Sequence, residues 1–161
     1  MTSSFMKNIR LPALALSSLL LASCASQVSD ITTDVPAERF MAKPGLPAQK
    51  LESGACAMFL WGAGHGRPLQ FYQDASIGDA RLAIDPSLMA KRQSTAKPVV
   101  EGFYAQQTFT QNDLKITVTV QPANSRNVLK GIPIPTGRMV VTEPNGRDTI
   151  MPVAGLFGCR N

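Results

Sequence analysis

Alternating apolar and polar residues predict that the second half of this chain is built from β-strands. The alternation is clearest from Leu114 to Gln121, where Leu, Ile or Val occupies every second position and Lys, Thr or Gln lies between. The aromatic-rich stretch 99–110 precedes it, and 111–113 reads as a turn. Two further strands, 138–142 and 149–156, flank an Asn-Gly pair, which is typical of a tight hairpin.

The first half of the chain predicts shorter strands separated by glycine-rich turns. An apolar run over 55–61 is bounded by glycines and is typical of a buried strand. Residues 62–68 then form a turn, and apolar and polar positions alternate again over 68–73 and 82–84. These elements are expected to pair with their sequence neighbours as hairpins.

Two stretches depart from the strand pattern. Asp85-Pro86 followed by Lys91-Arg92 predicts a short helix over 85–92, with aspartate as the N-cap, proline at the first helical position and basic residues at the end. The stretch 132–135 holds two prolines, which remove ladder donors, so it fits an edge strand or an extended lead-in. Together the elements predict an all-β domain, a small antiparallel barrel or sandwich of about seven strands with one short helix.

The N-terminus carries the features of a secretory signal. Lys7 and Arg10 precede an apolar run over 11–21, and small residues follow it. The run is shorter than the roughly 20 apolar residues that a membrane-spanning helix needs. Met6, directly before the charged region, is an alternative start to Met1.

The signal ends in Leu21-Ala22-Ser23-Cys24, which resembles the lipobox of bacterial lipoproteins. The resemblance implies that Cys24 receives a diacylglycerol, that the peptide is cut before it, and that several acyl chains anchor the protein stably in a membrane. Ala25 after the cysteine, by similarity to known sorting rules, favours the outer membrane, with the protein facing the periplasm; the sequence leaves the inner membrane open. The expected organisation is a signal peptide over 1–23, a lipidated flexible tether over 24–50 and one β domain over 51–161.

With Cys24 lipidated, Cys56 and Cys159 remain. The periplasm is oxidising, so we expect these two to form a disulfide that joins the first and last strands. The alternative is a metal-binding or catalytic thiol, which needs a histidine or acidic partner nearby, and His65 is the only histidine in the chain.

Charge argues against a nucleic-acid partner. Without the signal, 14 basic and 11 acidic residues remain, and the basic residues are scattered, with Lys91-Arg92 the only adjacent pair. A nucleic-acid interface is expected to show a basic stripe with interleaved aromatic residues.

Potential catalytic residues are few, so we expect no enzyme, cofactor or metal. His65 lies among glycines on a turn, and the Gly62–Gly66 loop leads into a strand rather than the helix that a phosphate loop requires. Asp74, Asp79 and Asp85 match no calcium loop and read as turn residues. No serine lies in a Gly-x-Ser-x-Gly motif.

Aromatic pairs could line a ligand pocket, although such residues in a small β domain are usually core. The two pairs are Phe103 with Tyr104 and Phe59 with Trp61. The sequence therefore assigns no ligand-binding residue, and these residues are unknown from the sequence alone.

These observations predict a membrane-anchored envelope lipoprotein that acts as a non-catalytic binding or assembly module, with an envelope protein as its partner. One alternative is an inhibitor of a cell-wall hydrolase, because residues 51–161 are similar in architecture to membrane-bound C-type lysozyme inhibitors. That family's serine-glycine segment has only a faint counterpart in Gly102-Phe103-Tyr104, and a slightly basic domain suits a basic lysozyme poorly. A small-ligand carrier is a third possibility and would need a wide apolar interior.

Overall fold

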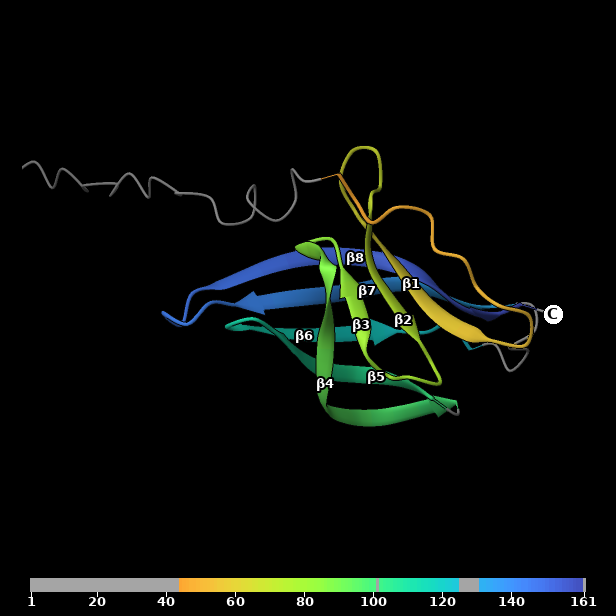
Figure 1. The fold of residues 1–161 in the computed structure, drawn as a ribbon. Helices are drawn as coiled ribbons and strands as arrows, with labels where there is room; N and C mark the ends of the chain where they lie inside the picture. Colours follow the sequence, from red (N-terminus) through yellow and green to blue (C-terminus); the bar gives the residue numbers. More distant parts are fainter. Residues whose placement is uncertain (1–43, 101, 125–130, 161) are drawn as a thin grey trace, which may run out of the picture. The chain divides into compact units, whose positions relative to one another are not determined.

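Eight antiparallel strands close into a barrel in which every strand pairs with its neighbours in the sequence (Figure 1). The computed structural model describes residues 44–100, 102–124 and 131–160. The strands are β1 (Cys56–Gly62), β2 (Leu69–Asp74), β3 (Ala80–Leu82), β4 (Asp85–Val100), β5 (Phe103–Gln111), β6 (Leu114–Gln121), β7 (Ile132–Thr142) and β8 (Asp148–Cys159). The all-β antiparallel barrel expected from the sequence is confirmed, with eight strands in place of about seven.

The interior of the barrel is filled mainly by the apolar residues of the period-two pattern, together with a few buried glutamines, of which Gln73 and Gln107 hydrogen-bond each other. Side chains alternate between the two faces of a strand, so every second residue points inward. The largest fully buried side chains are Met58, Leu60, Phe71, Leu82, Phe103, Phe109, Ile116, Ile132, Ile134, Met139, Met151 and Phe157. Burying one side chain of this size stabilises the fold by roughly 1.5–3 kcal/mol. The interior is therefore a packed core.

The barrel closes where the first and last strands meet. β1 pairs with β8 from Cys56 opposite Cys159 to Gly62 opposite Val153. The expected disulfide between the two cysteines is present and joins residues separated by 103 positions. The pairing continues outside the disulfide, because the Gly54 amide donates to the Arg160 carbonyl at 2.7 Å.

The predicted helix over 85–92 is wrong: this segment is the first half of β4. The Asp85 carboxylate does bind a local amide, that of Ser87 at 3.1 Å, and also the Ser87 hydroxyl at 2.6 Å. The contact closes an Asx turn that starts a strand, a role aspartate fills as readily as a helix N-cap. Pairing of Ala90 with Ala80 and of Lys91 with Thr110 then keeps the backbone extended.

The proline-containing stretch Ile132–Pro135 is the first part of β7, and among the described residues β8 is the only strand with which it pairs. The register of β6 with β7 stops at Thr136, so residues 132–135 form a local edge. The Pro133 carbonyl on that open side accepts the Ala123 amide at 2.8 Å. The expected edge position is confirmed, and it explains why two prolines are tolerated in one strand.

The described chain begins in the last residues of the expected tether. Leu46 is buried, and its amide donates to the Leu69 carbonyl at 2.6 Å. The signal sequence and Cys24 lie outside the described residues. Within the part of the chain that the structure describes, no helix has the length and apolar character needed to cross a membrane.

Candidate functional site

The outer surface of the barrel differs in character between its two sides. On β5 and β6 the buried positions alternate with polar ones, as the sequence alternation requires. The outward residues there include Gln106, Thr108, Thr110, Lys115, Thr117 and Thr119, and one aromatic residue, Tyr104, over whose ring Arg92 lies. We call this the polar side.

The opposite side, formed by β2, β1, β8 and β7, carries apolar residues at many of its outward positions. These residues are Phe59, Trp61, Tyr72, Pro133, Pro135, Pro152, Ala154 and Leu156, and together we call them the apolar face. Strand register makes the face continuous, because Tyr72 is opposite Phe59, Phe59 is opposite Leu156, and Leu156 is opposite Pro133. An extended apolar surface of this kind on a small protein is typical of an interaction site.

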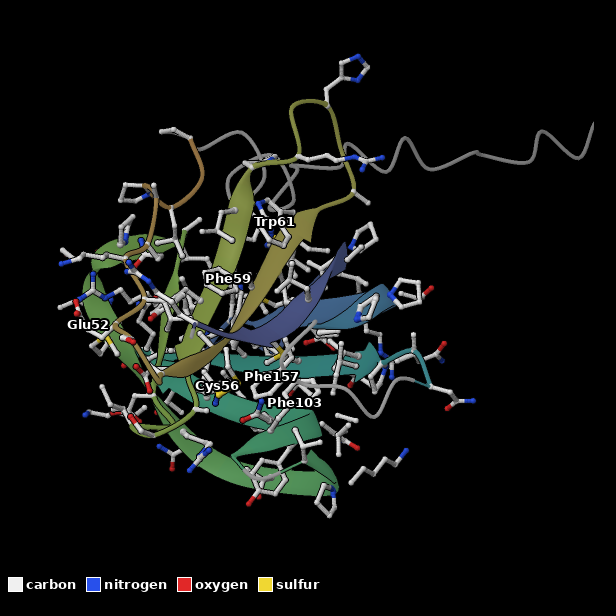
Figure 2. The ribbon with its side chains drawn as sticks, turned by 90° about the vertical axis from the view of Figure 1, so that its right-hand side faces the viewer. Glu52, Cys56, Phe59, Trp61, Phe103 and Phe157 are labelled. Atoms are coloured by element: carbon white, nitrogen blue, oxygen red, sulfur yellow. A yellow bond between two sulfur atoms is a disulfide. The ribbon has the colours of Figure 1, made fainter. Side chains whose placement is uncertain are left out.

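Three aromatic rings lie together on the apolar face. The Phe59 and Trp61 rings are stacked, with centroids 6.1 Å apart, and the Tyr72 ring is tilted against Phe59 at 5.3 Å. Figure 2 shows Trp61 near the end of β1, Phe59 farther along the same strand, and Cys56 beyond it. Partial burial raises the pKa of the Tyr72 phenol, an effect that Asp74 reinforces and Arg81 opposes.

A groove crosses the apolar face beside Trp61. Its volume is about 500 Å³, and its lining is Trp61, Gly62, Ala63, Arg67, Pro133, Ile134, Pro135, Ala154 and Gly155. Ala154 lies directly opposite Trp61 in the pairing of β1 with β8. Small residues on β8 therefore leave a hollow with Trp61 on one side and Pro133 and Pro135 on the other.

The β8 backbone at this groove admits no larger residue at position 155. A Cβ atom added to Gly155 would overlap the carbonyl oxygen of Phe59 and lie 2.9 Å from a methyl carbon of Leu60. The close approach of β8 to β1 thus depends on glycine here. The pairing of β7 with β8 has a register shift between Ile134 and Gly137, so the strand backbone is also irregular on the β7 side of the groove.

Among the residues that the structure describes, Arg67 is the only charged side chain that lines the groove. It lies in the exposed loop after β1 and has a φ of 40°, a left-handed value that few residues other than glycine adopt. The salt bridges between described residues are Lys50 with Glu52 and Lys91 with Asp79, so Arg67 has no carboxylate partner among those residues.

The residues singled out for chemistry in the sequence lie apart from this groove or in turns. His65 is exposed in the loop between β1 and β2. The Asp74 carboxylate accepts the Ser76 amide at 2.8 Å, as Asp85 does from Ser87, and both contacts close local turns. Among the residues that the structure describes, no three His, Cys, Asp or Glu side chains form a group that could hold a metal.

Asp79 links the turn before β3 to β4. Its carboxylate accepts hydrogen bonds from Lys91 Nζ at 2.6 Å and from the Arg92 amide at 3.1 Å. The Lys91 hydrogen bond is the main reason that the pKa of Asp79 falls below its ordinary value.

The two aromatic pairs expected as pocket residues, Phe103 with Tyr104 and Phe59 with Trp61, lie in different environments. Phe103 is fully buried and stacks on Phe157 with ring centroids 4.6 Å apart, so it belongs to the core (Figure 2). Phe59 and Trp61 are only partly buried and belong to the apolar face. The contribution of Pro133 and Pro135 to the groove could not be expected from the sequence, because only the barrel register brings them near Trp61.

A second hollow, of about 540 Å³, lies at the disulfide end of the barrel. Its lining is Gly54, Ala55, Cys56, Ala75, Ser76, Val100, Gly102 and Phe157, with no ionisable side chain among them. The groove beside Trp61 offers both an aromatic ring and a charge, so it is the stronger candidate site.

No protein-family model matches the chain, and comparisons with curated proteins and with solved structures give no significant match.

Proposed function

We propose that this protein is a membrane-anchored lipoprotein of the bacterial cell envelope whose barrel serves as a non-catalytic binding or assembly module. The apolar face is the observation that carries the binding role. A stable barrel needs only its interior to be apolar, whereas here aromatic and proline side chains also cover one outer side. The lipobox-like segment that ends at Cys24 supports the anchoring role.

A role as a carrier of small ligands inside the barrel has less support. An eight-stranded barrel has an interior just wide enough for its own side chains or for one small ligand. Four phenylalanines and several aliphatic side chains with less than 2% exposure occupy this interior. Binding on the outer surface is thus the better-supported mode.

The hydrolase-inhibitor alternative shares the barrel and the disulfide between the first and last strands. Its expected inhibitory segment would correspond to Gly102-Phe103-Tyr104. Phe103 lies in the core, however, so its ring is not available to enter an enzyme's cleft. This supports the binding or assembly module over the inhibitor.

The test of anchoring is metabolic labelling with an alkyne fatty acid in cells that express the full-length chain. We expect label on the wild-type protein and its loss in Cys24→Ser. The Cys56→Ser, Cys159→Ser double variant is the matched control and is expected to keep the label. Label that survives Cys24→Ser would contradict the proposed anchor.

The test of the binding role is crosslinking in intact cells, followed by mass spectrometry. One dominant envelope partner, lost in Cys24→Ser, is the expected result. Wild-type protein that forms no adduct above background would overturn the assembly role and return attention to inhibition and ligand-binding assays.

A further inference from the structure

We propose that the groove beside Trp61 binds an extended segment of a partner protein, which places an apolar side chain between Trp61 and the two prolines and a carboxylate on Arg67. This inference rests on the proposed binding role and specifies the chemistry of the partner. It is carried by the shape of the groove, by the kinds of side chain that line it, and by its charge.

The shape of the groove suits an inserted side chain. Ala154 is small and lies between the Trp61 indole on β1 and the prolines on β7, so the centre of the hollow is lower than its walls. Its volume of about 500 Å³ falls within the range of pockets that hold small ligands or a few side chains. A flat surface such as a bilayer would not fill it.

The lining favours a peptide over a sugar. A ligand rich in hydroxyl groups needs several polar side chains to replace its hydrogen bonds to water. Among the described residues of the lining, only Arg67 and the indole N–H of Trp61 are polar side-chain groups, and the other walls are pyrrolidine rings, aliphatic groups and backbone. An apolar side chain from an extended segment matches these walls, and tryptophan and arginine are the residues most enriched at the energetic centres of protein interfaces.

The charge around the groove favours an acidic segment. Arg67 makes no salt bridge with any described carboxylate, and Arg138 lies exposed on β7 three residues after Pro135, also without one. The outward positions of the four strands that form the apolar face include two carboxylates, and neither lines the groove. Asp74 ends β2 and accepts hydrogen bonds from Ser76, and Asp148 lies at the far hairpin and accepts one from Thr142. A carboxylate on the partner would supply the missing opposite charge.

The experiment places a photo-reactive benzoylphenylalanine at Pro135 of the full-length chain, in cells of the source organism. The matched control carries the same residue at Thr117, which points outward on the polar side. Disulfide formation is checked in each variant, so that a misfolded variant is recognised. We expect a protein adduct from position 135 and not from position 117, with the crosslinked peptide carrying Asp or Glu near the attached residue.

Two substitutions then test the contacts in the same crosslinking assay. Arg67→Glu is expected to lower the adduct yield by about tenfold, the effect of losing one charge-assisted hydrogen bond. Ala154→Phe is expected to abolish the adduct because the ring would fill the hollow. Arg147→Glu, in the exposed hairpin between β7 and β8, is the matched charge control and is expected to have no effect.

The outcomes separate this inference from the proposed function. An adduct from Thr117 alone, or a lipid or glycan adduct at position 135, would overturn the groove as a peptide site while leaving an envelope-binding role. An adduct at position 135 that Arg67→Glu leaves unchanged would overturn the carboxylate contact. If the wild-type protein crosslinks to no partner in cells, both the peptide-binding groove and the proposed envelope-binding role would be overturned.

Binding in solution provides the second measurement. Trp61 is the only tryptophan of the chain, so its fluorescence reports directly on the groove. A synthetic peptide with the crosslinked sequence should shift the Trp61 emission of the purified protein. The substitution Arg67→Glu should raise the Kd measured from this shift by about tenfold. An unchanged emission at saturating peptide would contradict occupancy of the groove.

Discussion

One residue of the groove, Gly155, illustrates how closely the first and last strands of this barrel are packed against each other. Gly155 brings β8 so near to β1 that a methyl group at this position would overlap the Phe59 carbonyl oxygen. The obstacle is backbone rather than the flexible end of a side chain, so relief requires the strands to move apart. The groove and the closure of the barrel therefore depend on the same glycine.

Gly155→Ala is predicted to lower the free energy of unfolding by about 3 kcal/mol or more, through overpacking between β1 and β8. Urea unfolding followed by circular dichroism measures the loss. Gly64→Ala is the matched control, because an added Cβ atom there has no neighbour within 4 Å. Equal stability of the two variants would show that the strands can separate freely at this point.

Asp79 gives the fold a pH-dependent contact. The hydrogen bond from Lys91 lowers the pKa of the Asp79 carboxyl in the folded protein relative to the unfolded chain. The ionised Asp79 carboxylate therefore makes its full contribution to the free energy of unfolding above the unfolded pKa of about 3.9. This contribution is lost as the pH falls through the lower pKa of the folded protein.

Asp79→Asn is predicted to lower the free energy of unfolding at pH 7 by up to about 1 kcal/mol, the upper range for a partly exposed ion pair. The difference from wild type should shrink as the pH is lowered below about 4. Chemical unfolding at a series of pH values tests this. Asp113→Asn, in the exposed turn between β5 and β6, is the control and is expected to change stability by less than about 0.5 kcal/mol. A difference that stays constant with pH would be inconsistent with an ionic origin.

At the scale of elements, β4 is the strand with the least complete pairing. It pairs with β3 only through residues 85–90, and from Lys91 to Val100 its described neighbour is β5 alone. Two register shifts interrupt this second half, and it contains Pro98 and a lysine, Lys97, with a φ of 58°. Bulges, lysine and proline are the devices by which exposed strand edges avoid pairing with other chains.

Pro98→Val is predicted to increase aggregation, because it restores a backbone donor and a regular strand at this edge. Light scattering and thioflavin T binding at equal protein concentration measure the effect. Pro152→Val is the matched control: Pro152 is also exposed, but β7 lies on one side of it and the Ala63 amide binds its carbonyl on the other. Similar aggregation of both variants would argue against the open edge as the cause.

The sequence predicted elements where a single pattern dominated, and failed where two patterns competed. β6 has the bounds expected from its alternation, and the Asn145-Gly146 hairpin is present, with the Gly146 amide donating to Glu143. Asp85-Pro86 is typical both of the start of a helix and of a turn that precedes a strand. The pairing of the following residues with β3 and β5 decides in favour of the strand. The groove could not be predicted, since Trp61 and Pro133 meet solely through the register of three strands.

At the scale of the whole molecule, one covalent bond fixes the seam between β1 and β8. In the chain-entropy model, closing a loop of about 100 residues contributes up to roughly 4–5 kcal/mol by restricting the unfolded chain. The twelve largest core side chains come from seven of the eight strands, so the disulfide reinforces a barrel that already has a continuous core.

The Cys56→Ser, Cys159→Ser double variant is predicted to lose up to about 4–5 kcal/mol of unfolding free energy, measured by urea denaturation. Dithiothreitol should cause a similar loss in the wild-type protein and none in the double variant. Unchanged wild-type stability under reducing conditions would mean that the hydrogen-bonded seam holds without the covalent link.

The seam between β1 and β8 also brings the two ends of the β domain together, so that the disulfide closes the chain of the domain into a ring. Cys56 and Cys159 have Cα atoms 3.9 Å apart, and Gly54 and Arg160 are still hydrogen-bonded beyond them. A short linker between these ends would therefore close the backbone without moving a strand. The chain could then be opened at the exposed 143–147 hairpin, giving a circular permutant in which all eight strand pairings are kept and new ends appear at the opposite pole.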